Sequence, residues 1–297
     1  MKVLFLAHLN DEIIDEPEDE IKIALEELGH EVIVVDEYNF DMEKLLSYSD
    51  KVDLLLFNRG GVYFTDEQDF FMSLTRLDLI LSQFKGKKVC WFLDKVWSYA
   101  NAFIAKILPR VDYIFVNDET WLRAFNTDKI FPLHAGCGKK REGSEMKELK
   151  SDIVFIGRIS GQRERFISEM KKRYGRRFKY YDNIWKEDFN NLCQSAKVIV
   201  LPRWPFDDFF WSDAIYRILS AGGFLIHPRL YGLQQEGFVE GAHYIAYASA
   251  KELSDAIEFW TKDKYKKDRK ELAKQGRDFV LDKFTYKKRL EEIFKKI

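Results

Sequence analysis

Arginine side chains gather at a glycine-bounded turn in the second half of the chain. In the segment "FIGRISGQRER", Arg158 follows a buried apolar run and Gly157, and a helix is expected to begin near Gly161. Guanidinium groups beside the backbone N–H groups of a helix N-terminus form a ready site for phosphate or diphosphate. The spacing is neither G-x-G-x-x-G nor a Walker loop, so a glycine turn with exposed arginines remains a second interpretation.

A carboxylate, Asp94, ends another apolar run. It is placed to act as a general base or to hold a substrate hydroxyl, and equally to cap the helix that follows. Polar side chains also end two other runs of the first half: His8 with Asn10, and Asn58 with Arg59. For His8, a role in capping or in the loop is the alternative to a ligand contact.

The segment "WSDAIYRILSAGGFLIHPR" poses a related question. It predicts a helix over residues 212–221, a break at Gly222-Gly223 and a buried strand over 224–227. Asp213 and Arg217 lie four residues apart on that helix. They are expected to form either an ion pair on the helix surface or the wall of a ligand site.

One basic segment, "KKRYGRRFKYY" at residues 171–181, interleaves cations with aromatic residues. Such a pattern is found on nucleic-acid surfaces. It is also typical of a helix C-terminus that runs into a strand, because the helix dipole favours lysine and arginine there. We favour the second interpretation.

Short apolar runs alternate with helical patterns throughout the first half. The segment "EDEIKIALEELGH", for example, repeats apolar residues at helical spacing and ends at a glycine. Apolar strands interleaved with amphipathic helices predict a parallel sheet covered on both faces. The predicted strands are residues 3–7, 32–35, 54–57, 89–93, 113–116 and 129–133.

Glycine and charged residues interrupt this alternation at residues 134–151, which are expected to connect two domains. The alternation then restarts through five further predicted strands: "DIVFIGRI", "FKYYD", "KVIVLPR", "GFLIHP" and "HYIAYA". The chain is therefore predicted to be an α/β protein with two doubly wound, Rossmann-like halves. Such sheets bind ligands beyond the carboxyl ends of their strands, so the two binding edges are expected to face one another across a cleft.

Charge is divided unevenly between the halves. Residues 1–130 carry 14 Lys and Arg against 25 Asp and Glu, a net charge of −11, whereas residues 131–297 carry 34 against 24, a net charge of +10. An anionic ligand suits the second half, and a polyanion is poorly matched to the first. Lysine-rich C-terminal helices are an alternative source of the positive excess.

Several classes of protein are excluded by the bulk features. A chain that is 46% hydrophobic and 33% charged is globular, and its apolar runs are too short for a membrane span. The N-terminal run has no small-residue cleavage site and is predicted to be a first strand. Three scattered cysteines match neither a disulfide framework nor a metal motif, so a reducing cytoplasm is expected.

Four segments of the second half occur in the order found in one known family. "DIVFIGRISGQRERFI" is followed by "LCQSAKVIVLP", then by the segment from "SDAIYRILSAGG" to "SAKELSDAI", and last by "RKELAKQGRDFVLDKFTYKKRLEEI". From about Asp152 to Phe294 this series resembles the C-terminal domain of CgeB-like glycosyltransferases, relatives of the group-1 nucleotide-sugar glycosyltransferases. The first half resembles the family more loosely, chiefly in "CWFLDK".

The resemblance implies the GT-B fold, in which two Rossmann-like domains face one another across a cleft and a C-terminal helix crosses back to the first. It places an acceptor domain at residues 1–140, a nucleotide-sugar donor domain at 150–275 and the crossing helix at 276–297.

Roles for individual residues also follow from the resemblance. Arg158 falls where such enzymes place an arginine on the donor diphosphate, and Arg163 or Arg165 is expected to supply a second cation. With the strand-end residues included, the predicted donor-binding set is Gly157, Arg158, Arg163, Arg165, Arg203, Arg217, Leu233 and Glu236. The predicted acceptor-binding set is His8, Asn10, Asn58 and Arg59, and Asp94 is the predicted catalytic residue.

The chain departs from the family pattern at Arg217. Many group-1 enzymes read Ser-Asp-Arg-x-x-Glu before the glycine pair, and that glutamate engages the donor ribose. Here the frame is "SDAIYR", so an arginine stands in place of the glutamate. A guanidinium cannot accept hydrogen bonds from ribose hydroxyls, although it binds phosphate or carboxylate. Either the donor is held differently, or Arg217 pairs with Asp213 and the ribose is recognised elsewhere.

The leading prediction is a glycosyltransferase that moves a sugar, of hexose type, from a nucleotide-sugar donor to a hydroxyl acceptor. It is expected to retain the anomeric configuration and to need neither a metal nor another cofactor. The acceptor is a saccharide, a small molecule or modified DNA. Transfer to hydroxymethylated bases of phage DNA is one alternative. A degenerate GT-B module that binds a sugar nucleotide or a partner without turnover is the other.

Overall fold

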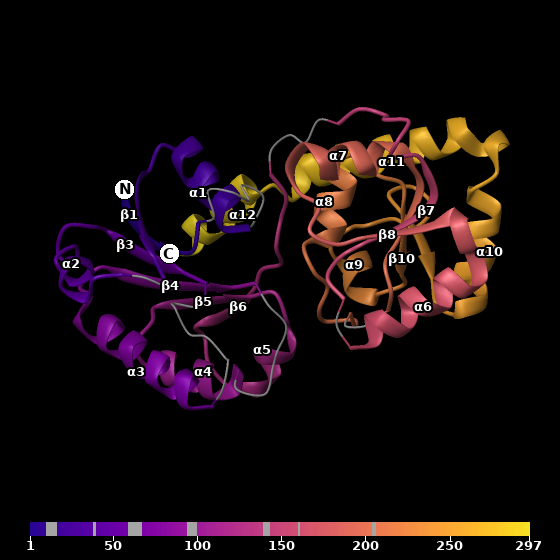
Figure 1. The fold of residues 1–297 in the computed structure, drawn as a ribbon. Coiled ribbons are helices and arrows are strands. Elements are labelled where there is room, and N and C mark those ends of the chain that lie inside the picture. The colour runs from indigo at the N-terminus through magenta and orange to yellow at the C-terminus, as the bar shows by residue number, and fades with distance from the viewer. Residues whose placement is uncertain are drawn as a thin grey trace. The chain divides into compact units, whose positions relative to one another are not determined.

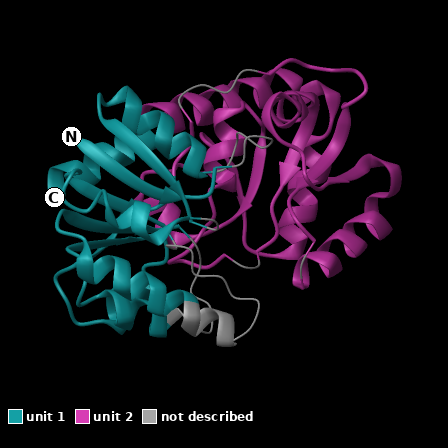
Figure 2. Ribbon diagram, turned by 60° about the vertical axis from the view of Figure 1, so that its left-hand side comes forward, with its two compact units in different colours: residues 1–135, 286–297 teal, residues 136–285 magenta. Residues whose placement is uncertain are grey.

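The computed structural model describes most of the chain: residues 1–9, 17–37, 40–58, 67–93, 100–138, 143–159, 161–203 and 206–297, with only the backbone for 67–72 and 100. The chain divides into two compact units (Figure 2). Unit 1 comprises residues 1–135 and 286–297, and unit 2 comprises residues 136–285.

Unit 1 is built on a parallel sheet, whose described strands number six and run in the order β2-β1-β3-β4-β5-β6. The strands are β1 (Lys2–Ala7), β2 (Glu31–Asp36), β3 (Leu54–Phe57), β4 (Lys87–Phe92), β5 (Tyr113–Val116) and β6 (Ile130–Pro132). The helices are α1 (Pro17–Glu27), α2 (Met42–Leu46), α3 (Glu67–Gln83), α4 (Ala100–Ile107), α5 (Thr120–Ala124) and α12 (Tyr286–Lys296). Each strand predicted for the first half is present.

Both faces of this sheet are covered by helices. Leu4 and Leu6 of β1 join the core that contains α3 and α4, whereas Val3 and Phe5 join the core that contains α1 and α12 (Figure 1). Successive side chains of a strand point to opposite faces. A sheet with two buried faces therefore needs apolar residues at every position, which is why the predicted strands appear as continuous apolar runs.

The last helix, α12, is part of unit 1, where it packs against α1. Its Tyr286 ring lies edge-on to Trp91, with 5.8 Å between the ring centroids. Arg289 is buried, and its Nε donates a hydrogen bond to the carbonyl oxygen of Ala135 at 3.3 Å. The structure divides the segment predicted as one helix over 276–297, because α11 ends at Lys283 and belongs to unit 2.

Unit 2 contains a second parallel sheet, for which the described strands have the order β11-β10-β9-β7-β8. The strands are β7 (Ser151–Ile156), β8 (Phe178–Tyr181), β9 (Ala196–Val200), β10 (Leu225–Pro228) and β11 (Ile245–Tyr247). The helices are α6 (Gln162–Tyr174), η1 (Gly175–Arg177), α7 (Lys186–Ser195), α8 (Ala214–Ser220), α9 (Tyr231–Gln235), α10 (Ala250–Trp260), η2 (Asp263–Tyr265) and α11 (Lys266–Lys283). The direction of winding reverses between β7 and β9, which are neighbours in the sheet.

The glycine pair after α8 fixes how this helix enters β10. Gly222 has φ +78°, and the N–H groups of Gly222 and Gly223 donate to the carbonyls of Leu219 and Ile218 at 2.8 and 2.9 Å. This pattern is a Schellman motif. A Cβ on Gly223 would lie 2.8 Å from Ile199, so backbone conformation requires the first glycine and close packing requires the second.

Among the described helices, none is long and apolar enough to cross a membrane.

Candidate functional site

A pocket of about 270 Å³ lies at the carboxyl edge of the unit 2 sheet. Its walls come from the loops after β7, β8 and β9 and from helices α6, α7 and α8. Because the winding reverses between β7 and β9, the pocket is at the topological switch point, where doubly wound sheets bind ligands. The charged side chains that line it are Arg158, Arg163, Asp182, Asp213 and Arg217.

Arg163 is a half-buried cation in the first turn of α6. Its Nη1 donates to the carbonyl oxygen of Arg158 at 3.4 Å, and its Nε is buried with no hydrogen-bond partner among the described residues. Burial lowers the pKa of Arg163 from its usual value, because the charged form loses hydration. No carboxylate in the described part of the chain pairs with it, so the pocket holds a positive charge that an anion can neutralise.

Gly157 brings the backbone to the mouth of this pocket. Its φ is +151°, and a Cβ at this position would lie 3.3 Å from the Phe155 ring. The exposed side chain of Arg158 follows directly. The first backbone N–H groups of α6 have no acceptor within the helix, as at every helix N-terminus. Two arginines and a helix start therefore lie together, as the sequence predicted for a phosphate site.

Arg217, on α8, also lines the pocket. Its guanidinium lies 5.2 Å from the centroid of Trp185 and 4.9 Å from that of Phe189. It also forms an ion pair with Asp213 at 3.7 Å, and its side chain is only 15% exposed. The sequence left open whether Asp213 and Arg217 form an ion pair or the wall of a ligand site. The structure shows both, because Arg217 pairs with Asp213 and also lines the pocket.

This arrangement predicts the effect of changing Arg217. In Arg217→Ala we expect the affinity for inorganic pyrophosphate, measured by calorimetry, to fall about tenfold, because a charge-assisted hydrogen bond contributes about 1.5 kcal/mol. The affinity of Arg217→Lys should lie between those of the wild type and Arg217→Ala, since lysine keeps the charge but not the planar stacking. Arg165→Ala is the matched control, and equal losses in Arg165→Ala and Arg217→Ala would contradict this role.

Four predicted donor residues lie outside the pocket lining. Arg165 is 84% exposed and pairs with Glu169 at 2.9 Å, and Arg203 donates to the carbonyl of Arg229 at 2.8 Å. Leu233 is fully buried in the core of unit 2, and Glu236 ends α9. Arg165 points away because α6 turns by about 100° per residue, which places Arg163 and Arg165 on different sides.

The pocket also contains residues that the sequence reasoning did not select. Asp182 and Asn183 follow β8, and Trp185 and Phe189 begin α7. The rule that ligands meet the carboxyl ends of strands applies to the end of "FKYYD" and would have found Asp182. Asn183 has φ +51°, a conformation that asparagine adopts more readily than most residues, but the sequence does not indicate that Trp185 then lies against Arg217.

In unit 1, His8 and Asn58 follow β1 and β3, the strands between which the winding reverses. His8 Nδ1 lies 3.2 Å from Asp36 Oδ1. Asn58 is only 8% exposed, and its Nδ2 donates to Glu18 at 2.9 Å. These contacts give Asn58 an internal structural role. Asn10, Arg59 and Asp94, which were predicted with them, lie outside the described residues.

The residue before Asp94 is held by two asparagine side chains. The Oδ1 of Asn58 accepts a hydrogen bond from the N–H of Leu93 at 3.4 Å, and the Nδ2 of Asn117 donates to the carbonyl of Leu93 at 3.0 Å. Asn117 is in turn bonded to the buried His134 at 2.9 Å. The chain is therefore anchored at Leu93, where it leaves the centre of the sheet.

Comparison with known proteins bears directly on the pocket of unit 2. Residues 158–295 match the model of the family described as glycosyl transferase-like. The matched residues make up a little less than half of the chain. This match begins at Arg158 and includes the two arginine-bearing helices of the pocket, α6 and α8. A search of curated proteins finds no match.

Solved structures share the whole architecture. Anabaena Alr3699/HepE in complex with UDP-glucose is similar over 100% of both chains, with a TM-score of 0.65 and 12% identity. An α-glucosyltransferase in complex with UDP and a 13-mer DNA containing an HMU base is similar over 99% of this chain and 98% of its own, with a TM-score of 0.69 and 9% identity. A glycosyltransferase from Rickettsia africae ESF-5 is similar over 99% of this chain and 96% of its own, with a TM-score of 0.61 and 11% identity. The predicted GT-B fold is confirmed.

Proposed function

We propose that this chain is a glycosyltransferase that holds a nucleotide-sugar donor in the unit 2 pocket and transfers the sugar to a hydroxyl acceptor. The glycosyltransferase family match covers the pocket from Arg158 onward. The observation that carries the proposal is the half-buried guanidinium of Arg163, which has no carboxylate partner among the described residues and lies at the start of α6. A donor diphosphate supplies the missing negative charge.

Arginines in this position support chemistry as well as binding. When the glycosidic bond to the donor breaks, negative charge builds up on the leaving diphosphate. Guanidinium groups and helix N–H groups already aimed at that position stabilise the transition state more than the ground state. Arg163 is partly withdrawn from water, so its interaction with the developing charge is less screened than at a surface.

Asp94 is our candidate for positioning or deprotonating the acceptor hydroxyl. The support for this assignment is the sequence pattern "CWFLDK" and the anchoring of Leu93 by Asn58 and Asn117. A catalytic carboxylate benefits from a fixed backbone immediately before it, because misplacement by about 1 Å costs about 100-fold in rate. His8, Asn10 and Arg59 remain candidate acceptor contacts within this proposal.

The pocket arginines also lead us to propose that transfer is independent of metal. Their charge neutralises the diphosphate in place of a divalent cation. We therefore expect the transfer rate to change by less than about twofold after treatment with EDTA, as followed by release of the nucleotide. A loss of activity that Mg²⁺ or Mn²⁺ restores would contradict this part of the proposal.

Finer features rest on the resemblance to CgeB-like enzymes. We propose that the sugar is a hexose and that transfer retains the anomeric configuration, which the NMR coupling of the anomeric proton in the first-formed product reports. A cytoplasmic location accords with the three cysteines, which are all buried free thiols.

A second candidate takes modified DNA as its acceptor. The α-glucosyltransferase in the comparison, bound to UDP and an HMU-containing DNA, is the observation that motivates it. The net charge of −11 over residues 1–130 opposes a duplex on that part of the chain. DNA binding that weakens steeply with salt, together with transfer to hydroxymethylated bases, would favour this candidate over a saccharide or small-molecule acceptor.

The deciding experiment is a donor screen. UDP-, GDP-, ADP-, TDP- and CMP-sugars are tested by thermal shift, and those that bind are tested for donor hydrolysis and for transfer. We expect one nucleotide to stabilise the chain and its sugar to be released or transferred. Binding without turnover would identify the degenerate module, and binding of none would contradict the proposed function.

A further inference from the structure

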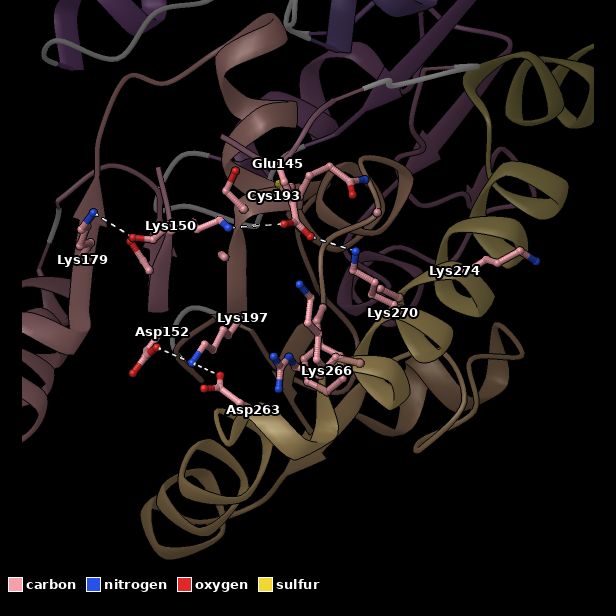
Figure 3. Close-up of a pocket in the computed structure, with 18 of the residues that line it drawn as sticks. Glu145, Lys150, Asp152, Lys179, Cys193, Lys197, Asp263, Lys266, Lys270 and Lys274 are labelled. Carbon is pink, nitrogen blue, oxygen red and sulfur yellow. Dashed lines mark hydrogen bonds and ion pairs between the residues drawn. The ribbon is translucent and has the colours of Figure 1, made fainter. Parts of the chain in front are cut away.

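A second cavity of unit 2, of about 840 Å³, lies at the opposite edge of the sheet from the donor pocket. Ser151 and Ala196, the first residues of β7 and β9, line it, whereas the donor pocket lies beyond the last residues of these strands. Helix α11 forms one side of the cavity (Figure 3). The two sites are therefore separated by the length of the strands.

Positive charge dominates the second cavity. Ten of its lining residues are Lys or Arg and four are Asp or Glu, so the lining has a net charge of +6. Part of the excess comes from α11, where Lys266, Lys270, Lys274 and Arg277 recur every three or four residues. At this spacing the four residues lie on one side of the helix, about 6 Å apart along its axis.

Two of the four carboxylates that line the cavity, Glu145 and Asp152, are each shared between two cations. Glu145 lies 2.9 Å from Lys270 and 3.8 Å from Lys150, which approach it from different sides (Figure 3). The hydrogen bond from Lys270 lowers the pKa of Glu145, and the charges of Lys266 and Lys150 lower it further. The charge of Glu145 therefore cancels less than the positive charge around it.

Asp152 shows the same pattern at the start of β7. It lies 3.0 Å from Arg177 and 3.1 Å from Lys197, and Lys197 also reaches Asp263 at 2.7 Å. Two further cations of the lining, Arg176 and Lys266, are exposed and have no ion pair within the described part of the chain. They can turn toward a ligand without breaking an existing contact.

The shape and lining of the cavity select the type of anion. Its one aromatic lining residue, Phe224, is buried, so the described lining offers no exposed ring on which a nucleic-acid base could stack. A hollow edged by carboxylates is also poorly matched to a flat membrane surface. We propose that this cavity is a second anion site, which binds a compact multivalent anion of the oligophosphate class through Arg176, Lys266 and the cations beside them.

Inorganic tripolyphosphate is the probe, titrated into the full chain by calorimetry at constant ionic strength, because salt screens such charges. We expect Arg176→Ala/Lys266→Ala to weaken binding at least about tenfold. The matched control is Lys172→Ala/Lys267→Ala, which removes two exposed charges from the same two regions of the chain outside the cavity lining. We expect this control to bind as the wild type does.

Arg163→Ala separates this inference from the proposed function. We expect it to leave one tripolyphosphate site intact. If Arg163→Ala abolishes all binding and Arg176→Ala/Lys266→Ala does not, tripolyphosphate binds only in the donor pocket and the second site is refuted. Equal losses in the two double variants would also refute it. The second site is also refuted if a single-stranded oligonucleotide, or vesicles of phosphatidylcholine and phosphatidylserine, bind through Arg176 and Lys266 more tightly than tripolyphosphate does. In that case tripolyphosphate would not compete with them.

Discussion

Arg163→Ala should weaken the binding of the donor nucleoside diphosphate by about 10- to 100-fold. A hydrogen bond to a charged group contributes about 1.5–3 kcal/mol, and each 1.4 kcal/mol is a factor of ten in the dissociation constant. The loss should extend to kcat with the complete donor, because the guanidinium opposes charge that grows in the transition state. Calorimetry with the nucleotide and rates of nucleotide release measure the two effects.

The same substitution should not reduce stability in the absence of ligand. Arg163 is half-buried without a carboxylate partner among the described residues, and its burial lowers its pKa, so the folded chain bears the cost of a partly dehydrated charge. Removing it should leave the free energy of unfolding unchanged or slightly greater. Arg165→Ala is the control, since this exposed arginine contacts Glu169 and does not line the pocket. Unchanged nucleotide binding in Arg163→Ala would contradict the assignment.

Asp94→Asn should have the largest effect on turnover. General acid–base catalysis by a positioned side chain contributes about 100- to 10,000-fold, and asparagine keeps the shape of aspartate without its basicity. We therefore expect kcat to fall by about that factor while the dissociation constant of the donor nucleotide stays within twofold. Steady-state rates, combined with calorimetry on the same protein, separate the chemical step from binding.

A matched carboxylate tests whether this loss is specific. Asp50→Asn changes an exposed aspartate that lies before β3, at the amino ends of the strands, whereas Asp94 follows the carboxyl end of β4. Among the described residues, the ion pair of Asp50 is with Lys85 at 4.0 Å. It should behave as the wild type does. A kcat for Asp94→Asn within a factor of three of the wild type would remove Asp94 from the mechanism and leave the donor site unaffected.

The fold could be predicted from the sequence because its signals are local and repeated. Both faces of each sheet are buried, so strands such as Leu54–Phe57 are continuous apolar runs. The glycines at 222 and 223 mark the end of α8 because one needs a positive φ and the other has no room for a Cβ. The division of the C-terminal helices was less visible, since Phe284 and Thr285 carry no strong helix-breaking signal.

The site was predicted in part. Gly157 and Arg158 could be found because they follow a strand directly, and Arg163 because it begins the next helix. The family resemblance left Arg163 and Arg165 as alternatives for the second cation, and only the direction of the Arg165 side chain on α6 excludes it from the lining. The place of Trp185 and Phe189 against Arg217 is a contact between separate elements, α7 and α8, and contacts of this kind require the structure.

The most direct test of the donor site is a crystal structure of the chain with UDP, or with the nucleotide that the donor screen selects. We predict that the diphosphate lies at the carboxyl ends of β7 and β9, with phosphate oxygens within hydrogen-bonding distance of the Arg163 guanidinium and of the first N–H groups of α6. A nucleotide bound elsewhere in the chain, with Arg163 making no contact to it, would contradict the proposed donor site.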